Sequence, residues 1–275
     1  ITYIKDLQVY PDIYNKKIKV KLTVGNAVKD NKIKTELTVT KRRGDVKVKV
    51  APENYVINCD SVIEFSYDLK GNTHYWDEYH QSFYDLNVKI SSTDESWSDN
   101  KSVTFGMRKF STKGKHFTIN DRITFLRGKN DACVFPNTGH TPMDEETWMK
   151  VMSTAKEYGI NHYRFHSWCP PDAAFRAADK LGIYMQVELP YWGNIDSLYS
   201  RMYDEGFNLL KNYANHPSFV MFSMGNELWG DTQKAGQLMN NLKKFDSRPL
   251  YALGSNVNIG FTWPPEGADF FVGAR

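Results

Sequence analysis

The chain has 275 residues, of which 41% are hydrophobic and 24% charged, with a formal net charge of +3. These proportions are ordinary for a folded protein, so a disordered or collagen-like chain is excluded. The near balance of 35 basic and 32 acidic residues argues against a nucleic-acid partner or a membrane-surface partner. No apolar run approaches the roughly 18 residues of a membrane helix, so we expect no membrane partner of any kind.

Residues 1–109 have the pattern of β-strands. Charged and apolar residues alternate over 17–24, 34–40, 45–50, 62–69 and 84–90, and glycines interrupt the pattern between several of these stretches. Strict alternation buries one face of a strand and exposes the other to water. We therefore predict that residues 1–109 form an antiparallel β-sandwich with a solvated, lysine-rich outer face.

Residues 110–275 alternate between strands and helices. Helices are expected to begin at Thr141, Asp172, Ser197 and Asp231, each a residue type that favours a helix start. Strands are expected at 161–166, 183–189, 219–224, 250–253 and 269–272, after a first strand that ends at Asn130 and Asp131. Serial strand–helix units predict a parallel sheet. No Gly-x-Gly-x-x-Gly motif follows the first strand, which favours a barrel over a nucleotide-binding sheet.

A complete (β/α)8 barrel needs roughly 250 residues. We therefore expect 110–275 to hold an incomplete TIM barrel of about six strands.

Polar and aromatic residues gather where these strands end, which is where TIM barrels carry their chemistry. The candidates are Asn130, Asp131, Arg164, His166, Glu188, Trp192, Asn226, Glu227 and Trp229. Amides and carboxylates bind hydroxyl groups, and indole rings pack on the apolar faces of sugars. A carbohydrate is therefore the expected substrate. No metal-ligand spacing and no phosphate-binding loop is present, so we expect no metal and no cofactor.

Several motifs resemble glycoside hydrolase family 2. The segment Asn215-His216-Pro217-Ser218 through Gly225-Asn226-Glu227 is similar to the fourth barrel strand of retaining glycosidases. Residues 117–128 resemble the hairpin that opens the barrel of that family, and 163–166 and 177–184 resemble its second strand and the approach to its third.

The resemblance implies an immunoglobulin-like sandwich followed by the catalytic barrel, and a retaining, β-galactosidase-like exo-glycosidase. In that family Glu227 would be the general acid/base, Asn226 would bind the sugar 2-hydroxyl, and Arg164 would lie near the nucleophile. The nucleophile belongs to strand seven of the family barrel. We therefore expect it outside this chain, expect the chain alone to be inactive, and expect the remaining domains of a longer protein as its partners.

Departures from the family pattern leave alternatives open. Arg164 is followed by Phe165-His166-Ser167-Trp168 where the β-galactosidase branch has Ser-His-Tyr, so the sugar is undetermined. After Glu188, the acid and histidine that hold magnesium in some members are missing.

Five of the candidates also have a structural alternative: helix capping for Glu227, ion pairing with Arg164 for Glu188, hydrogen bonding for His166 and roof packing for Trp192 and Trp229. Alternative functions are a cellulase or mannanase, against which the sandwich argues, and a non-catalytic carbohydrate-binding protein. A glutamate in strand seven would separate the enzyme from the binder.

Overall fold

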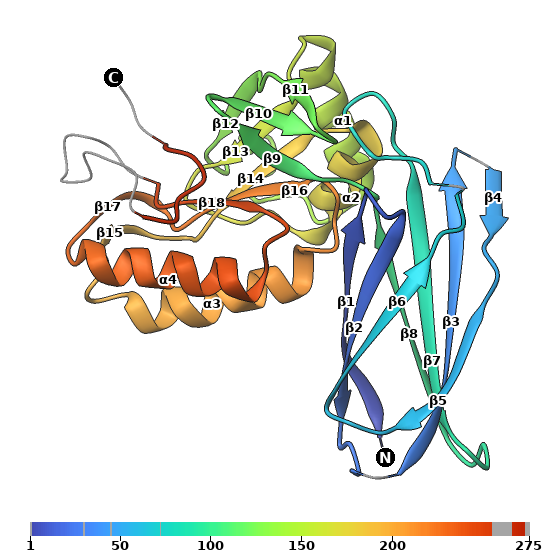
Figure 1. Cartoon of the computed structure of the whole chain (residues 1–275). Helices are drawn as coiled ribbons and strands as arrows, with labels where there is room; N and C mark the ends of the chain where they lie inside the picture. The colour runs from blue at the N-terminus through green and yellow to red at the C-terminus, as the bar shows by residue number, and fades with distance from the viewer. Residues whose placement is uncertain (1, 30, 45, 72, 255–265, 273–275) are drawn as a thin grey trace. The chain divides into compact units, whose positions relative to one another are not determined.

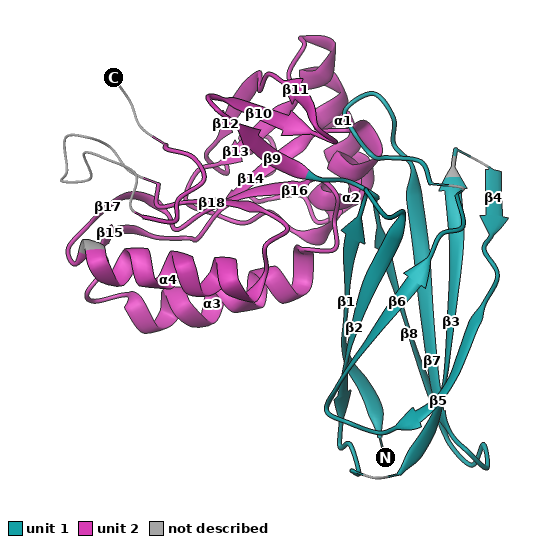
Figure 2. Ribbon diagram, in the orientation of Figure 1, with its two compact units in different colours: residues 1–109 teal, residues 110–275 magenta. Residues whose placement is uncertain are grey.

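The computed structural model describes residues 2–29, 31–44, 46–71, 73–254 and 266–272. It consists of two compact units, Ile1–Lys109 and Phe110–Arg275 (Figure 2). Each unit has its own hydrophobic core.

The first unit is built from antiparallel strands (Figure 1). The strands are β1 (Tyr3–Asp12), β2 (Lys17–Gly25), β3 (Lys32–Arg43), β4 (Val46–Lys49), β5 (Glu53–Asn58), β6 (Val62–Asp68), β7 (Phe83–Ser92) and β8 (Ser98–Phe105). One sheet has the order β1-β2-β6 and the other the order β4-β3-β7-β8, with β5 also paired to β3.

The alternating pattern explains the core of this unit. In β2, Ile18, Val20 and Leu22 are fully buried, whereas Lys17 and Lys19 are exposed. The inner faces of both sheets contribute to a single cluster of buried side chains. The predicted sandwich is therefore confirmed. The alternating pattern did not predict β1, β5 and β8. In β8 the reason is its composition, because this strand is polar and has only a weak apolar repeat.

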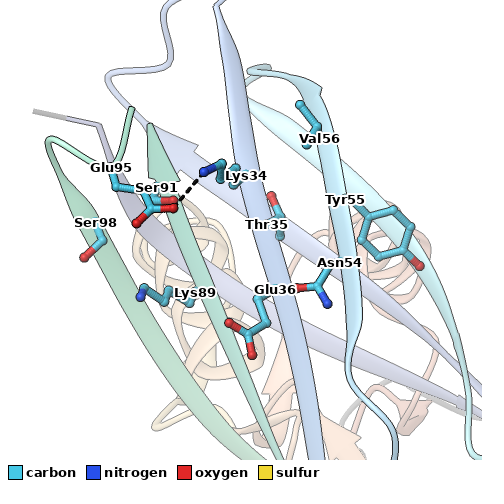
Figure 3. A pocket seen from close by; sticks show the side chains of 10 residues that line it. All are labelled: Lys34, Thr35, Glu36, Asn54, Tyr55, Val56, Lys89, Ser91, Glu95 and Ser98. Atoms are coloured by element: carbon cyan, nitrogen blue, oxygen red, sulfur yellow. Dashed lines mark hydrogen bonds and ion pairs between the residues drawn. The ribbon is translucent and has the colours of Figure 1, made fainter. Parts of the chain in front are cut away.

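The outer face of the second sheet carries a polar hollow of about 440 Å³, shown in Figure 3. Lys34 and Glu36 of β3 line it together with Lys89 of β7 and Glu95, and Lys34 pairs with Glu95 at 2.7 Å. Charges of both signs line this hollow, as on an ordinary solvated sheet surface.

The second unit is an α/β unit. Its strands are β9 (Phe110–Lys113), β10 (His116–Ile119), β11 (Arg122–Thr124), β12 (Gly128–Asp131), β13 (His162–Phe165), β14 (Tyr184–Glu188), β15 (Trp192–Asn194), β16 (Phe219–Ser223), β17 (Asn226–Trp229) and β18 (Leu250–Ala252). Its helices are α1 (Glu145–Glu157), α2 (Asp172–Leu181), α3 (Tyr199–Tyr213) and α4 (Thr232–Phe245). None of these helices is both long and apolar enough to cross a membrane in the part of the chain that the structure describes.

The main sheet of this unit is parallel, with the order β12-β13-β14-β16-β18. One face packs against the helices: Tyr163, Phe165, Met185 and Val187 belong to the same buried cluster as Phe175 of α2. Figure 1 shows α3 and α4 lying side by side, and Gly206 of α3 closely approaches Leu242 of α4. The other face carries polar side chains, which are described below. An incomplete barrel is therefore confirmed.

Two smaller sheets complete the unit. The hairpin expected at 117–128 is confirmed as β10 and β11, which turn through Asn120 and Asp121, both with positive φ. This matches the two-residue turn that suits the twist of paired strands. Strands β15 and β17 form a parallel pair at positions where the sequence indicated only strand ends and loops.

Two of the four expected helix starts, Thr141 and Ser197, were wrong, and the other two, Asp172 and Asp231, were confirmed. α1 begins at Glu145, where Asp144 rather than Thr141 accepts the backbone N–H of Thr147 at 2.7 Å. α2 begins at Asp172, although Pro171 rather than Asp172 is its N-cap, and α3 begins at Tyr199 rather than at Ser197. Asp231 does cap α4, because its carboxylate accepts the N–H groups of Gln233 and Lys234. Short polar residues are frequent near helix starts, so residue type alone places the cap only within a few positions.

The expected strand at 269–272 is also wrong. Asp269 lies beside β18, where its N–H donates to the carbonyl of Tyr251 at 2.8 Å and its carboxylate accepts from Tyr251 N at 2.9 Å. The side chain of Asp269 therefore makes one of the hydrogen bonds that a neighbouring strand would make with β18. Within the described residues, no strand follows Asp269. Over the residues that the structure describes, the parallel sheet has five strands, not the six expected.

Candidate functional site

Three predicted residues meet at the carboxyl ends of three neighbouring strands. Arg164 of β13 donates from Nε to Glu188 Oε1 at 2.6 Å and from its terminal nitrogen to Asn226 Oδ1 at 2.8 Å. Glu188 ends β14, and Asn226 follows β16. The guanidinium thus ties the second strand of the sheet to the last residue of the third strand and to a residue that follows the fourth. These contacts form the centre of the candidate active site.

Glu188 is a buried ion-pair partner rather than an exposed ligand. Its side chain is fully buried, and its second oxygen accepts the backbone N–H of Ser167 at 2.8 Å. Burial raises the pKa of Glu188, and the charge of Arg164 opposes that shift. Only donors surround the carboxylate in these contacts. Direct binding of substrate by Glu188 stays a prediction, whereas its structural alternative, the pairing with Arg164, is present in the structure.

Further polar residues that the sequence analysis missed line the same face of the sheet. Gln186 donates to Ser223 Oγ at 3.2 Å and lies 3.4 Å from Glu188 Oε1. His162 contacts the carbonyl of Tyr184 at 3.0 Å, and burial lowers its pKa to about 4, so the ring is neutral near pH 7. Gln186 and Glu188 stand two positions apart in an otherwise apolar run. That spacing could have revealed a polar inner face.

Glu227 is held in an unusual backbone conformation. Its φ is +44°, in the left-handed region that costs a non-glycine residue roughly 1–2 kcal/mol. The residue is half-buried and directly follows Asn226, whose N–H donates to the carbonyl of Tyr191 at 3.0 Å. Strain of this kind persists only where the surroundings enforce it, and it concentrates at functional sites.

Two glycines shape the turn before Asn226. Gly225 has φ +138°, and a Cβ there would lie 2.5 Å from the carbonyl oxygen of Tyr191. Gly254 has φ +75°, and its Cβ would lie 1.9 Å from the carbonyl oxygen of Gly225. The segment after β18 therefore presses directly on the turn that carries Asn226 and Glu227.

We expect Gly254→Ala to lower kcat/KM for a nitrophenyl glycoside at least about tenfold, because the new methyl group must displace the Gly225 carbonyl and so move Glu227. Gly139→Ala is the matched control: Gly139 also has positive φ, +70°, but a Cβ there meets no atom within 4 Å. Both variants place alanine at a positive φ, which costs stability. Only Gly254→Ala also pushes on the turn that carries Glu227. Equal activity of the two variants in the whole protein would contradict this account.

Aromatic residues form the rim of the site. Trp192 of β15 is the ladder partner of Asn226 in β17, and its ring lies 5.4 Å from the ring of His166. Trp192 is 58% exposed and Trp229 is 47% exposed. The ring of Trp229 lies close to Gly193: a Cβ added to that glycine would be 3.5 Å from the nearest ring atom. Both tryptophans therefore offer ring surface to solvent.

Asn130 and Asp131 lie on opposite faces of the first strand. Asn130 is exposed and is the ladder partner of Arg164. Asp131 is buried; its carboxylate accepts from Lys129 Nζ at 2.7 Å and from Cys133 N at 3.1 Å. A side chain one position further along a strand points to the other face, so Asp131 points away from the side that Asn130 shares with Arg164, and its binding of substrate stays a prediction.

The sequence around Glu188 offers few metal ligands. Residues 189–193 put no carboxylate or imidazole beside Glu188. Across the described ranges, no three His, Cys, Asp or Glu side chains lie together as a metal site requires.

Known proteins resemble this chain along most of its length. A curated β-galactosidase of Oenococcus oeni is 24% identical over 280 residues, which cover 95% of this chain and 27% of that protein. A glycosyl hydrolase family 2 member from Bacteroides cellulosilyticus has a structure that matches with a TM-score of 0.78 and 18% identity, over 95% of this chain and 36% of its own. A β-glucuronidase from Bacteroides uniformis matches with a TM-score of 0.75 and 18% identity, over 95% and 35% respectively.

The chain thus spans about a quarter to a third of the length of these proteins. Two family models match it in tandem. Residues 2–108 match the glycosyl hydrolases family 2 model, and residues 110–259 match the model of the TIM barrel domain of that family. The chain belongs to glycosyl hydrolase family 2.

Proposed function

We propose that the whole protein to which this chain belongs is a retaining glycosidase that hydrolyses terminal β-glycosidic bonds, with Glu227 as its general acid/base. The observation that carries the proposal is the 2.8 Å contact between Arg164 and Asn226. It ties the Asn-Glu pair after β16 to the arginine of β13, at the end of the sheet where barrels of this kind carry their chemistry.

Glu227 would act twice in this reaction. It first protonates the glycosidic oxygen as the bond to the leaving group breaks, and it then removes a proton from the water that releases the sugar. A half-buried position suits both steps, because the group must reach substrate and water alike. Asn226 would hydrogen-bond the 2-hydroxyl of the sugar, an interaction that strengthens in the transition state of glycoside hydrolysis.

Retention also requires a second carboxylate, roughly 5–5.5 Å from the first, as nucleophile. Glu188 is fully buried and bound by Arg164 and Ser167. The carboxylate of Asp131 is bound by Lys129 on the opposite face of its strand. The backbone carbonyl of Glu266 accepts from Asn240 of α4, which places Glu266 in an exposed turn beside that helix. We therefore propose that the nucleophile comes from another segment of the whole protein.

For the sugar we propose a neutral, β-galactoside-like substrate. The guanidinium of Arg164 is neutralised by Glu188, so it is a poor partner for the carboxylate of a uronic acid. The test is a panel of nitrophenyl β-glycosides assayed on the whole protein. Fastest release from the galactoside supports the proposal, and preference for the glucuronide contradicts the choice of sugar. Binding of sugars without any hydrolysis would indicate the non-catalytic alternative.

Trp192 is proposed to stack on the leaving-group sugar at the rim. Trp192→Ala should lower kcat/KM for a β-linked disaccharide about tenfold, since aromatic packing contributes about 0.5–1.5 kcal/mol beyond its buried area. The corresponding β-glycosyl fluoride has no leaving-group ring and should react unchanged. Tyr158→Ala is the control, because Tyr158 is 84% exposed at the C-cap of α1 and precedes the amino end of β13, whereas the site residues lie at the carboxyl ends of the strands. Equal losses on disaccharide and fluoride would contradict the assignment.

A further inference from the structure

The contacts around Arg164 form a chain with a fixed direction. Glu188 accepts from Arg164 Nε at 2.6 Å, and Asn226 Oδ1 accepts from a terminal nitrogen of the same guanidinium at 2.8 Å. The other oxygen of Glu188 accepts from Ser167 N at 2.8 Å. Both oxygens of the buried carboxylate are thereby held, and Arg164 is clamped between an acid and an amide.

The chemistry of the guanidinium determines how the Asn226 amide must lie. Arginine has five N–H donors and no acceptor. The group of Asn226 that faces Arg164 must therefore be the carbonyl oxygen, which leaves Nδ2 to donate on the other side. An amide turned by 180° would set two donors against each other. Arg164 thus selects one of two orientations that are nearly equal in shape.

We infer that Glu188 is a positioning residue that, through Arg164, fixes the amide of Asn226 with Nδ2 as its substrate-facing donor, so that the site recognises the oxygen of the sugar 2-hydroxyl. The inference rests on the proposed function and deepens it. Glu188 itself contacts no substrate in this arrangement. Its role is to prevent the guanidinium from leaving Oδ1 of Asn226.

Removal of the carboxylate frees this arrangement. Glu188 now accepts from three donors, Arg164 Nε, Ser167 N and Gln186 Nε2, whereas the side-chain amide of Glu188→Gln has only one accepting oxygen. Arg164, whose side chain is 24% exposed, then gains freedom to turn toward water. The Asn226 amide then lacks the hydrogen bond that fixes its orientation. In protein molecules whose Asn226 turns Oδ1 toward the sugar, the amide no longer donates to the 2-hydroxyl.

The test measures recognition of one hydroxyl group in the whole protein. The measured quantity is the ratio of kcat/KM for a nitrophenyl β-glycoside to that for its 2-deoxy analogue. Comparing this ratio between variants cancels the intrinsic reactivity difference of the two substrates. We expect Glu188→Gln to lower the ratio at least about tenfold, Asn226→Ala to lower it at least as far, and the double variant to lower it no further than Asn226→Ala.

The chain offers a matched control at the other end of the sheet. Arg248 donates to Asp246 Oδ1 from Nε at 3.0 Å and to Asn215 Oδ1 from its terminal nitrogen at 2.7 Å, the same trio of groups. Asn215 precedes β16 and Asp246 precedes β18, so this trio lies at the amino ends of the strands. Asp246→Asn should cost stability as Glu188→Gln does and leave the substrate ratio unchanged.

Arg164→Lys supplies a second route if Glu188→Gln folds poorly, because a single ammonium group cannot bridge Glu188 and Asn226 as the planar fork does. It too should lower the ratio. A ratio unchanged from wild type in the folded Glu188 or Arg164 variant, while Asn226→Ala lowers it, would overturn the positioning role alone. An equal fall in Asp246→Asn would overturn it as well. Absence of glycoside hydrolysis by the wild-type protein would overturn the proposed function and this inference with it.

Discussion

Glu227→Gln is expected to slow hydrolysis of unactivated glycosides by about 10²–10⁴-fold, the usual contribution of a general acid or base. Glutamine keeps the size of the side chain at the strained φ of +44° but cannot deliver a proton. Substrates with poor leaving groups need that proton, whereas dinitrophenyl glycosides do not. Bond cleavage in the activated substrates should therefore be slowed far less.

The comparison of leaving groups separates this role from simple damage to the fold. Steady-state and burst kinetics should be measured for a disaccharide and for a dinitrophenyl glycoside of the same sugar. Glu266→Gln, at an exposed turn, is the control and should match wild type on both. An equal fall of bond cleavage on both substrates would show that Glu227 is not the acid.

The 275-residue chain on its own is expected to give no glycosidase turnover. Retention needs two carboxylates on either side of the scissile bond. Of the acids near the candidate site, Glu188 is buried in its pair with Arg164, and Asp131 is held by Lys129. Neither can attack a sugar carbon without breaking those contacts. The loss relative to the whole protein should be complete.

The measurement is hydrolysis of a dinitrophenyl glycoside by the purified chain, with the whole protein at equal concentration as the positive control. A preparation of the chain carrying Glu227→Gln controls for contaminating enzymes. Suppose that the unsubstituted chain turns over substrate and the Glu227→Gln chain does not. That result would show that the chain contains its own nucleophile.

Much of the fold follows from local periodicity. Alternation in β2 and β7 separates buried from exposed side chains, and the nearly all-apolar β16 is what burial on both faces requires. The prediction of a strand at 269–272 was wrong for a reason that periodicity cannot detect. The side chain of Asp269, rather than another strand, satisfies the backbone of Tyr251.

The candidate site was predictable in its members but not in their roles. Strand ends identified Arg164, Glu188 and Asn226, because parallel strands bring their carboxyl ends to one edge. Which of these residues faces substrate depends on burial and on donor directions across three strands. The pressure of Gly254 on Gly225 is likewise a contact between distant segments, and no local pattern indicates it.

The most direct test of the account is rescue of Glu227→Ala by azide. Without the acid/base, a dinitrophenyl glycoside should still load the nucleophile, but water should release the sugar slowly because no base activates it. Azide needs no proton removed and should restore turnover, and the product should be the β-glycosyl azide, identified by NMR. Lack of rescue, or formation of the α-glycosyl azide, would contradict a retaining mechanism with Glu227 as its acid/base.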